Sequence, residues 1–253
     1  MIKRFADNIV LVTGGSTGIG QATALAFARE GAKVVITSRQ RHAGEKTAAL
    51  LKAEQGDACF IQADVTVEAD MARLLEQIVA RYDRLDIAFN NAGSVGTGAI
   101  TEIKEALWDE TIASNLKGTW LSMKYELQQM LTQGSGTIVN MSSNLGGHVA
   151  RPMMAPYAAA KAGVLALTQV AALEYIQSGI RINAVSPGPI RTPLSKRVAE
   201  TDEERDRRVA DTLPIGRIGL PEEVAHAVLW LSSSEASFVV GHDIVLDGGF
   251  IIQ

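Results

Sequence analysis

Tyr157 and Lys161 stand four positions apart in the segment APYAAAKAG, an alanine-rich stretch that is typical of a helix. Side chains at i and i+4 lie on one helical face, so the lysine ammonium can stand one turn from the phenol. A neighbouring positive charge favours the phenolate and lowers the pKa of a tyrosine. Such a phenol, held on a rigid element, is a candidate general acid–base catalyst. The alternative is an ordinary helix with an exposed tyrosine and a solvated lysine.

The elements that must hold this pair alternate between short apolar runs and longer amphipathic segments. The short runs, most of them rich in valine and isoleucine, are typical of parallel strands covered on both faces. This strict alternation predicts a doubly wound, Rossmann-like α/β fold, with a seven-stranded parallel sheet and helices on both faces. The predicted strands are 9–12, 34–37, 58–62, 87–90, 137–141, 181–185 and 243–246. The predicted helices are 18–30, 42–55, 67–82, 103–132, 155–177 and 221–232.

Length and composition fit one domain. The chain has 253 residues, of which 47% are apolar, and no linker-like shift in composition divides it. Its least regular part, at about 189–215, is expected to be a lid, because ligands of such sheets bind beyond the carboxyl ends of the strands.

Charge, cysteine content and hydropathy narrow the class of protein further. A net charge of −4 with mixed signs gives no field that would attract nucleic acid. The single cysteine, Cys59, suits a reducing compartment, and no apolar run approaches the roughly 18 residues of a membrane span. Four scattered histidines show no metal-ligand spacing, so no metal site is predicted. These features predict a cytoplasmic protein that binds neither membrane nor nucleic acid.

A glycine-rich turn, TGGSTGIG at 13–20, follows the first predicted strand and opens the first predicted helix. Glycines let the backbone turn sharply and approach a pyrophosphate, whose charge is met by the free N–H groups of the helix. The glycine spacing is one residue wider than the usual dinucleotide fingerprint. Its place after the first strand favours phosphate binding over a merely tight turn.

The second predicted strand ends in Ser38 and Arg39, where a site for NAD usually carries an acidic residue. A carboxylate would repel a 2′-phosphate, whereas an arginine pairs with it and a serine can donate to it. We therefore expect Ser38 and Arg39 to select NADP(H) over NAD(H), with Arg41 as a possible second contact. The alternative, in which these residues are ordinary solvated side chains, leaves NAD(H) possible.

In this order the motifs resemble the one-domain short-chain dehydrogenase/reductase family along essentially the whole chain. The resemblance adds several motifs to the glycine turn and the tyrosine–lysine pair. They are Asp64-Val65, Asn90-Asn91-Ala92-Gly93, Asn115, Ser142-Ser143, Pro187-Gly188 and Val245-Leu246-Asp247-Gly248-Gly249.

The resemblance implies four catalytic residues. Tyr157 would exchange a proton with the substrate oxygen, and Lys161 would hold the nicotinamide ribose and keep the phenol acidic. Ser143 would donate a hydrogen bond to the reacting oxygen. Asn115 would support a water that links Lys161 to bulk solvent.

The resemblance also implies a set of residues around the cofactor. Asp64 would touch the adenine, although a plain capping aspartate is the competing interpretation, and Thr192 would bind the carboxamide. Asn91 and its neighbours would lie beside the cofactor or merely tighten a strand-end turn. The full set is Gly14, Ser16, Thr17, Gly18, Ile19, Gly20, Ser38, Arg39, Asp64, Val65, Asn91, Ala92, Gly93, Tyr157, Lys161, Pro187, Gly188, Ile190 and Thr192.

The sequence leaves alternatives for the residues that would contact the substrate. Ser142 and Ser143 point to opposite faces of their strand, so only one can reach the substrate, and alignment on Gly146 favours Ser143. The expected substrate contacts are Ser143, Leu145, Met154 and Tyr157, and the apolar wall favours a bulky ketone over a small charged acid. His148 could also touch substrate. Arg151 is the candidate cation that would bind a carboxylated or phosphorylated substrate.

These features predict an NADP-dependent oxidoreductase that transfers a hydride between the nicotinamide and a carbonyl or secondary alcohol. Alternatives are an NAD-dependent alcohol, diol or sugar dehydrogenase, a 3-oxoacyl-thioester reductase, and a non-catalytic redox sensor or interaction module. The resemblance implies a homotetramer, or a dimer, paired through the helices at about 103–132 and 155–177.

Overall fold

Seven parallel strands form one sheet in the computed structural model of the protein, which describes residues 3–54, 57–197 and 199–253. Their order across the sheet is β3-β2-β1-β4-β5-β6-β7, which confirms the doubly wound arrangement. The order reverses between β1 and β4, and their carboxyl ends therefore mark the expected ligand site. The strands are β1 (Ile9–Thr13), β2 (Lys33–Ser38), β3 (Ala58–Gln62), β4 (Ile87–Asn90), β5 (Gly136–Met141), β6 (Ile180–Pro187) and β7 (Asp243–Leu246).

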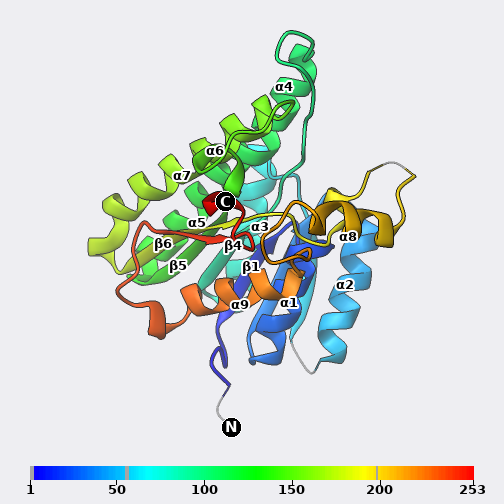
Figure 1. Cartoon of the computed structure of the whole chain (residues 1–253). Helices are drawn as coiled ribbons and strands as arrows, with labels where there is room; N and C mark the ends of the chain where they lie inside the picture. Colours follow the sequence, from blue (N-terminus) through cyan, green and yellow to red (C-terminus); the bar gives the residue numbers. More distant parts are fainter. Residues whose placement is uncertain (1–2, 55–56, 198) are drawn as a thin grey trace.

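Helices cover both faces of the sheet (Figure 1). One face carries α1, α2 and α9, and the other carries α3, α5 and α7. The helices are α1 (Gly18–Arg29), α2 (Arg41–Ala53), α3 (Glu68–Tyr82), α4 (Glu105–Ile112), α5 (Gly118–Gln133), α6 (Asn144–Gly147), α7 (Ala155–Tyr175), α8 (Asp202–Ala210) and α9 (Pro221–Ser232). The last residue of the predicted helix 42–55 lies outside the described residues.

Alternation along β1 explains why two separate cores form. Val10 and Val12 pack with Phe27 of α1 in one core, whereas Ile9 and Leu11 belong to the other. All four β1 side chains are at most 2% exposed, because both faces of the strand are covered.

The predicted helix 103–132 differs from the structure in its middle. It begins at Glu105 as α4, passes through a π-helical turn at Ala113–Lys117 and continues as α5. A π turn inserts one extra residue into the helical ladder, and no motif in the sequence marked its position within the predicted helix. Asn115 lies within this turn.

The segment Ala155–Ser178, which is α7 with the short 3₁₀ turn after it, is long and apolar enough to cross a membrane by length and composition alone, with a mean hydropathy of 1.2. In the fold one face of α7 packs against the sheet, where Val164 and Ala172 are almost completely buried. Its apolar character therefore suits a helix that covers the core.

A buried polar network crosses the centre of the sheet. Asn90 of β4 and Asn140 of β5 are direct partners in the ladder, and Asn90 Nδ2 donates to Asn140 Oδ1 at 3.0 Å. The same nitrogen donates to Glu126 Oε2 of α5 at 2.9 Å, and Asn140 Nδ2 donates to Thr168 Oγ1 of α7. Burial raises the pKa of Glu126 from its ordinary value of 4.5 to about 8. The network therefore ties two helices to two strands, and its link to α5 is a carboxyl group that is protonated at neutral pH.

We expect this carboxyl group to make stability depend on pH. Between pH 4.5 and about 8 the folded protein holds a proton that the unfolded chain has lost. The free energy of unfolding should therefore fall as pH rises through this window, by up to about 1.4 kcal/mol per pH unit from this group. Glu126→Gln should remove that component, which urea unfolding of the cofactor-free protein across the window would measure. The exposed Glu76→Gln is the control, and an unchanged slope in Glu126→Gln would contradict the assignment.

Candidate active site

The tyrosine–lysine pair lies in the first two turns of α7, which starts at Ala155 with a proline in its first turn. Lys161 Nζ stands 5.7 Å from the centroid of the Tyr157 ring, so the four-residue spacing places both on one face. The lysine side chain is 3% exposed, and its Nζ donates to the Met141 carbonyl at the end of β5 at 2.7 Å.

Burial shifts the pKa of both groups. It lowers the pKa of Lys161 to about 7, and it raises the pKa of the Tyr157 phenol against an opposing hydrogen bond with Ser143. The expectation that the lysine lowers the pKa of the phenol is therefore not met in the protein alone. Loss of hydration disfavours the charged form of each group and is the largest cause of both shifts.

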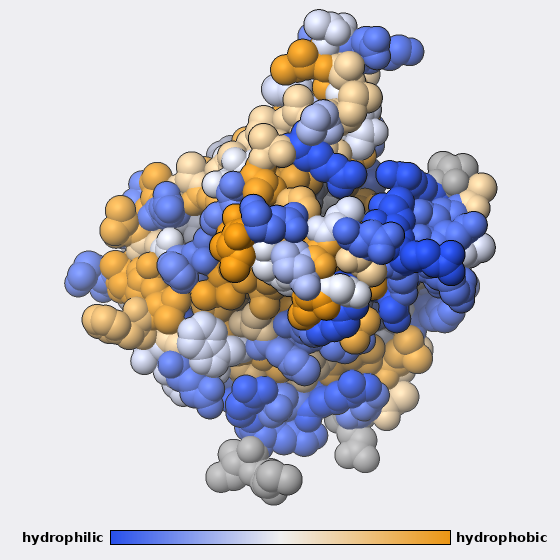
Figure 2. Space-filling view, viewed as in Figure 1, coloured by the Kyte–Doolittle hydropathy of each residue, from blue (hydrophilic) through white to orange (hydrophobic). Residues whose placement is uncertain are grey.

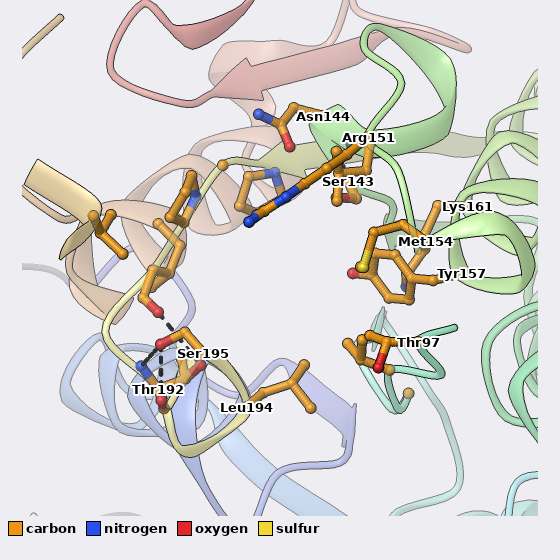
Figure 3. A pocket seen from close by; sticks show the side chains of 18 of the residues that line it. Thr97, Ser143, Asn144, Arg151, Met154, Tyr157, Lys161, Thr192, Leu194 and Ser195 are labelled. Carbon is orange, nitrogen blue, oxygen red and sulfur yellow. Dashed lines mark hydrogen bonds between the residues drawn. The ribbon is translucent and has the colours of Figure 1, made fainter. Parts of the chain in front are cut away.

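The two serines at the end of β5 have different partners. Ser142 Oγ donates to the Lys161 carbonyl at 2.9 Å, so this hydroxyl is engaged with the backbone of α7. Ser143 Oγ accepts from the Leu145 amide at 3.1 Å and reaches Tyr157. Figure 3 shows Ser143 and Tyr157 facing the same cavity. Both serines line the cavity, and these contacts favour Ser143 as the serine that can meet a substrate oxygen.

Asn115 and Gly93 lie against Lys161. Asn115 Nδ2 donates to the carbonyls of Ser94 and Thr111, each at 2.8 Å, and this fixes the side chain in the π turn. Its buried Oδ1 has no hydrogen-bond partner among the described residues. A Cβ on Gly93 would lie 2.4 Å from this oxygen and 3.8 Å from Lys161 Nζ. Glycine is required here because a side chain would fill the space that these two polar atoms face.

The glycine turn has the backbone that phosphate binding needs. Gly14 and Gly18 adopt φ of +62° and +55°, values that other residues seldom reach. A Cβ on Gly20 would lie 2.4 Å from the Gly14 carbonyl, so the turn closes tightly on the start of α1. Asn91 Nδ2 donates to the carbonyls of Thr13 and Gly14 at 3.1 and 3.2 Å and joins this turn to the end of β4. Asn91 therefore tightens this turn, and it also lines the main cavity.

The N-terminus of α1 is open to an anion. Thr17 at its N-cap makes no side-chain capping bond, and no acidic residue lies in the first turn. Its free N–H groups and positive dipole end lie beside the cavity, which Ile19 lines. These features fit the pyrophosphate of a dinucleotide.

The end of β2 leads to a second cavity of about 640 Å³. Arg39 is exposed and lines it, whereas Arg41 pairs with Glu45 at 3.5 Å. Ser38 Oγ makes a long contact of 3.4 Å with the Gln40 carbonyl. Asp64 Oδ1 accepts from the amide and hydroxyl of Thr66, as the capping interpretation of this residue requires. Val65 packs against Gly118 at the start of α5.

The described residues of the segment at 189–215 contribute to the lining of the cavity, and the start of the segment is tied to Gly219. Arg191 N donates to the Gly219 carbonyl, and Gly219 N donates to the Pro189 carbonyl. Thr192 lies directly over the glycine turn, because a Cβ on Gly18 would lie 3.2 Å from Thr192 Cγ2. Farther along, Val209 and two neighbours form a small core of their own against Phe250.

These elements enclose a main cavity of about 900 Å³. It brings together the predicted residues Asn91, Gly93, Asn115, Ser143, Leu145, Met154, Tyr157, Lys161, Pro187, Gly188, Ile190 and Thr192. Sequence reasoning missed Thr97 and Phe250. Phe250 follows the Asp247-Gly248-Gly249 motif after β7, which ends at the same edge of the sheet. That motif was a usable signal, whereas nothing marks Thr97.

His148 does not line this cavity. Its Nε2 stands 2.6 Å from Asp243 Oδ2, which also accepts a hydrogen bond from Ser186. The loop that carries His148 is thereby fixed to β7, and the residue has a structural contact in place of the possible substrate contact.

Comparison with known proteins identifies the family. A family model described as enoyl-(acyl carrier protein) reductase matches residues 14–251. Cis-4-hydroxycyclohexanecarboxylate dehydrogenase of Sinomonas cyclohexanicum is 42% identical over 251 residues, which cover 99% of each chain. Cyclohexanol dehydrogenase of Acinetobacter sp. (strain SE19) is 39% identical, with 99% of this chain and 97% of that protein covered. A crystal structure of a short-chain type dehydrogenase/reductase from Mycobacterium marinum superposes with a TM-score of 0.94 at 33% identity, covering 100% of this chain and 98% of the other.

The chain belongs to the short-chain dehydrogenase/reductase family. It is accordingly an oxidoreductase that acts on CH–OH or C=O groups.

The different contacts of the two serines predict different mutational effects. Ser143→Ala should lower kcat by about 100-fold or more, because it removes a donor at the position where negative charge develops. Ser142→Ala removes only the bond to the Lys161 carbonyl, so it should cost about 1 kcal/mol of stability while affecting kcat far less. Steady-state kinetics and thermal unfolding of both variants would measure this. Equal losses of kcat would contradict the assignment of Ser143.

Proposed function

We propose that this protein is an NADP-dependent oxidoreductase that transfers a hydride between the nicotinamide and a carbonyl or secondary alcohol carbon, with Tyr157 as the acid–base group. The observation that carries the proposal is the convergence of Tyr157, Ser143 and Lys161 on one wall of the main cavity. A phenol, a hydroxyl donor and an ammonium at one place suit a reaction in which charge develops on a single oxygen.

In the reductive direction the Tyr157 hydroxyl gives its proton to the substrate oxygen while Ser143 donates a hydrogen bond to the same atom. In the oxidative direction the phenolate accepts the proton. Lys161 stabilises the phenolate by its charge, and Asn115, whose Oδ1 beside Gly93 has no partner among the described residues, supports a water that carries protons to solvent. The hydrogen bond from Lys161 to the Met141 carbonyl fixes the lysine side chain beside Tyr157.

The cofactor, when bound, supplies the hydride at its nicotinamide carbon. The residues that would hold it run from the glycine turn, with the open N-terminus of α1, to Thr192 of the lid segment. Lys161 would hold the nicotinamide ribose. The uncapped first turn of α1 and the two glycines with positive φ are the features that fit the pyrophosphate.

Tyr157→Phe tests the mechanism. The variant keeps the ring and its packing but has no proton to exchange, so kcat should fall by about 1,000-fold or more while the cofactor affinity changes little. Ketone reduction followed by loss of nicotinamide absorbance, together with fluorescence titration of the cofactor, would measure both quantities. A variant that turned over at near-normal rate would overturn the mechanism.

The preference for NADP rests on the end of β2. The described residues of the second cavity include Arg39 without an ion-pair partner, next to Ser38, and no acidic residue stands at the last position of the strand. A 2′-phosphate there would meet an arginine and a hydroxyl donor. Arg41 contributes less, because Glu45 engages it.

Arg39→Leu tests this preference. It should raise KM for NADPH by about 10-fold or more and leave KM for NADH nearly unchanged, because only the 2′-phosphate loses its partner. Arg73→Leu is a suitable control, since Arg73 lines the same cavity but pairs with Asp70. Ser38→Asp should shift the preference further towards NADH. A wild-type enzyme that strongly preferred NADH would refute the proposal.

The names of two relatives and the lining of the main cavity favour a ring ketone or a ring alcohol as the substrate. The two relatives described above are named as dehydrogenases of cyclohexane-ring alcohols. Apolar side chains line the corresponding wall here, among them Val95, Leu145, Met154 and Leu194. A straight-chain 3-oxoacyl thioester, an NAD-dependent dehydrogenation and a non-catalytic redox module remain the alternatives. An activity screen over ring ketones, a 3-oxoacyl thioester and both cofactors separates them.

We further propose a cytoplasmic homotetramer. Apolar side chains gather on the surface over α7 (Figure 2), where Val170 and Leu173 are 54% and 78% exposed, and Trp120 of α5 is also exposed. Exposed apolar residues on these helices support their pairing with a second copy. Light scattering during gel filtration would test it.

A further inference from the structure

Arg151 reaches into the main cavity from the loop between α6 and α7. Figure 3 shows its side chain extending into the space between the wall that carries Tyr157 and the wall that carries Thr192 and Leu194. The side chain is exposed, and within residues 3–54, 57–197 and 199–253 no carboxylate lies at ion-pair distance from it. Its guanidinium is therefore available to a ligand in the cavity.

The charged side chains that line the cavity are all basic among the described residues. Five basic residues line it, and no aspartate or glutamate does so among the described residues. The basic residues are Arg151, Lys161, Lys196, Arg197 and Arg208. Such a lining raises the local concentration of anions and disfavours cations.

Three of these cations already have partners in the protein. Arg208 binds Glu200 through two hydrogen bonds of 2.6 and 2.9 Å, and Lys196 pairs with Asp202 at 3.0 Å. Lys161 is fixed on the Met141 carbonyl. This leaves Arg151 and Arg197, and only Arg151 belongs to the loop that also carries the substrate-facing Met154.

The Arg151 loop is held in a defined shape. Met153 adopts a φ of +70°, a conformation that costs a non-glycine residue energy and persists only where surrounding contacts impose it. The Met153 carbonyl accepts a hydrogen bond from Gly98 N at 2.9 Å, and Gly98 and Met154 form a short parallel bridge. The loop after β4 thus braces the backbone next to Arg151, as a binding residue requires.

We propose that Arg151 binds a carboxylate on the substrate, so that the preferred substrate is a ring-bearing oxo or hydroxy acid whose acid group lies remote from the reacting carbon. The apolar wall around Leu145 and Met154 receives the ring, and the planar guanidinium receives the carboxylate through two parallel hydrogen bonds. This inference rests on the proposed oxidoreductase function and adds the class of substrate to it.

The phosphates of the cofactor are a less suitable occupant for Arg151. The glycine turn and the N-terminus of α1 lie under Thr192, as the approach of Gly18 to Thr192 shows. Arg151 enters the cavity from beside Ser143, and its side chain extends into the space between the two walls (Figure 3). A group bound by Arg151 consequently shares the main cavity with Tyr157 and Ser143, away from the glycine turn under Thr192.

The test compares two ketones that differ only in charge, 4-oxocyclohexanecarboxylate and its neutral amide. Wild-type protein should show a kcat/KM for the acid at least about 10-fold above that for the amide. In Arg151→Met the ratio of the two values should fall by about 10- to 100-fold, as expected for the loss of a charged hydrogen-bonded pair. Arg151→Lys should recover part of the ratio, because it restores the charge without the planar fork.

Arg197→Met is the matched control, because it removes the other cavity-lining cation that has no ion pair in the described structure. Its ratio should stay at the wild-type value. Equal rates for the two ketones in wild-type protein, an unchanged ratio in Arg151→Met, or loss of the ratio in Arg197→Met alone would each overturn the proposal for Arg151.

Failure of the proposed function gives a different result. In that case wild-type protein reduces neither ketone with NADPH or NADH. The dissociation constants of the acid and the amide can then be measured by calorimetry, which requires no turnover. The protein is saturated with NADP⁺ or NAD⁺, whichever binds more tightly. Tighter binding of the acid that disappears in Arg151→Met supports the assignment, and equal binding of the two compounds overturns it.

Discussion

A buried ammonium group is the constraint around which this site is organised. Lys161 is almost fully removed from water, and the Met141 carbonyl is the acceptor that the described structure provides for its Nζ. Burial accordingly lowers the pKa of the lysine to about 7 and raises that of Tyr157. Each group would stabilise the other in charged form, yet each is penalised by the same loss of hydration. In the proposed mechanism the missing acceptors are the ribose hydroxyls of the cofactor and a water at Asn115, so binding completes the catalytic pair.

The remaining elements of the fold position the groups that surround the Lys161 ammonium. β5 provides the carbonyl that fixes it, and the serine that reaches Tyr157 follows two residues after the strand. The π turn between α4 and α5 brings Asn115 against Gly93, and Asn91 joins the end of β4 to the glycine turn. All these contacts gather at the carboxyl edge of the sheet beside the reversal of strand order. The site therefore depends on parallel strands that end at the same edge of the sheet. Side chains from distant parts of the sequence become neighbours there.

Much of this arrangement could be predicted from the sequence because it is encoded locally. Apolar runs marked all seven strands, and the spacing of Tyr157 and Lys161 placed both on one helical face. Other features depend on contacts between distant segments. The choice between Ser142 and Ser143 follows from where α7 lies, and the reversed pKa effect follows from burial that no local pattern encodes. The π turn was missed because no motif in the sequence marks it, and the direction of Arg151 is set by a loop braced through Gly98.

The ionisation of Tyr157 tests the central claim most directly. It can be followed by the ultraviolet absorbance of tyrosinate during a pH titration, with the signal of Tyr157→Phe subtracted from that of wild-type protein. The account predicts that the Tyr157 signal appears at clearly lower pH in protein saturated with oxidised cofactor than in free protein, because a charged Lys161 then stands beside the phenol. A signal at the same pH in both states would contradict the account.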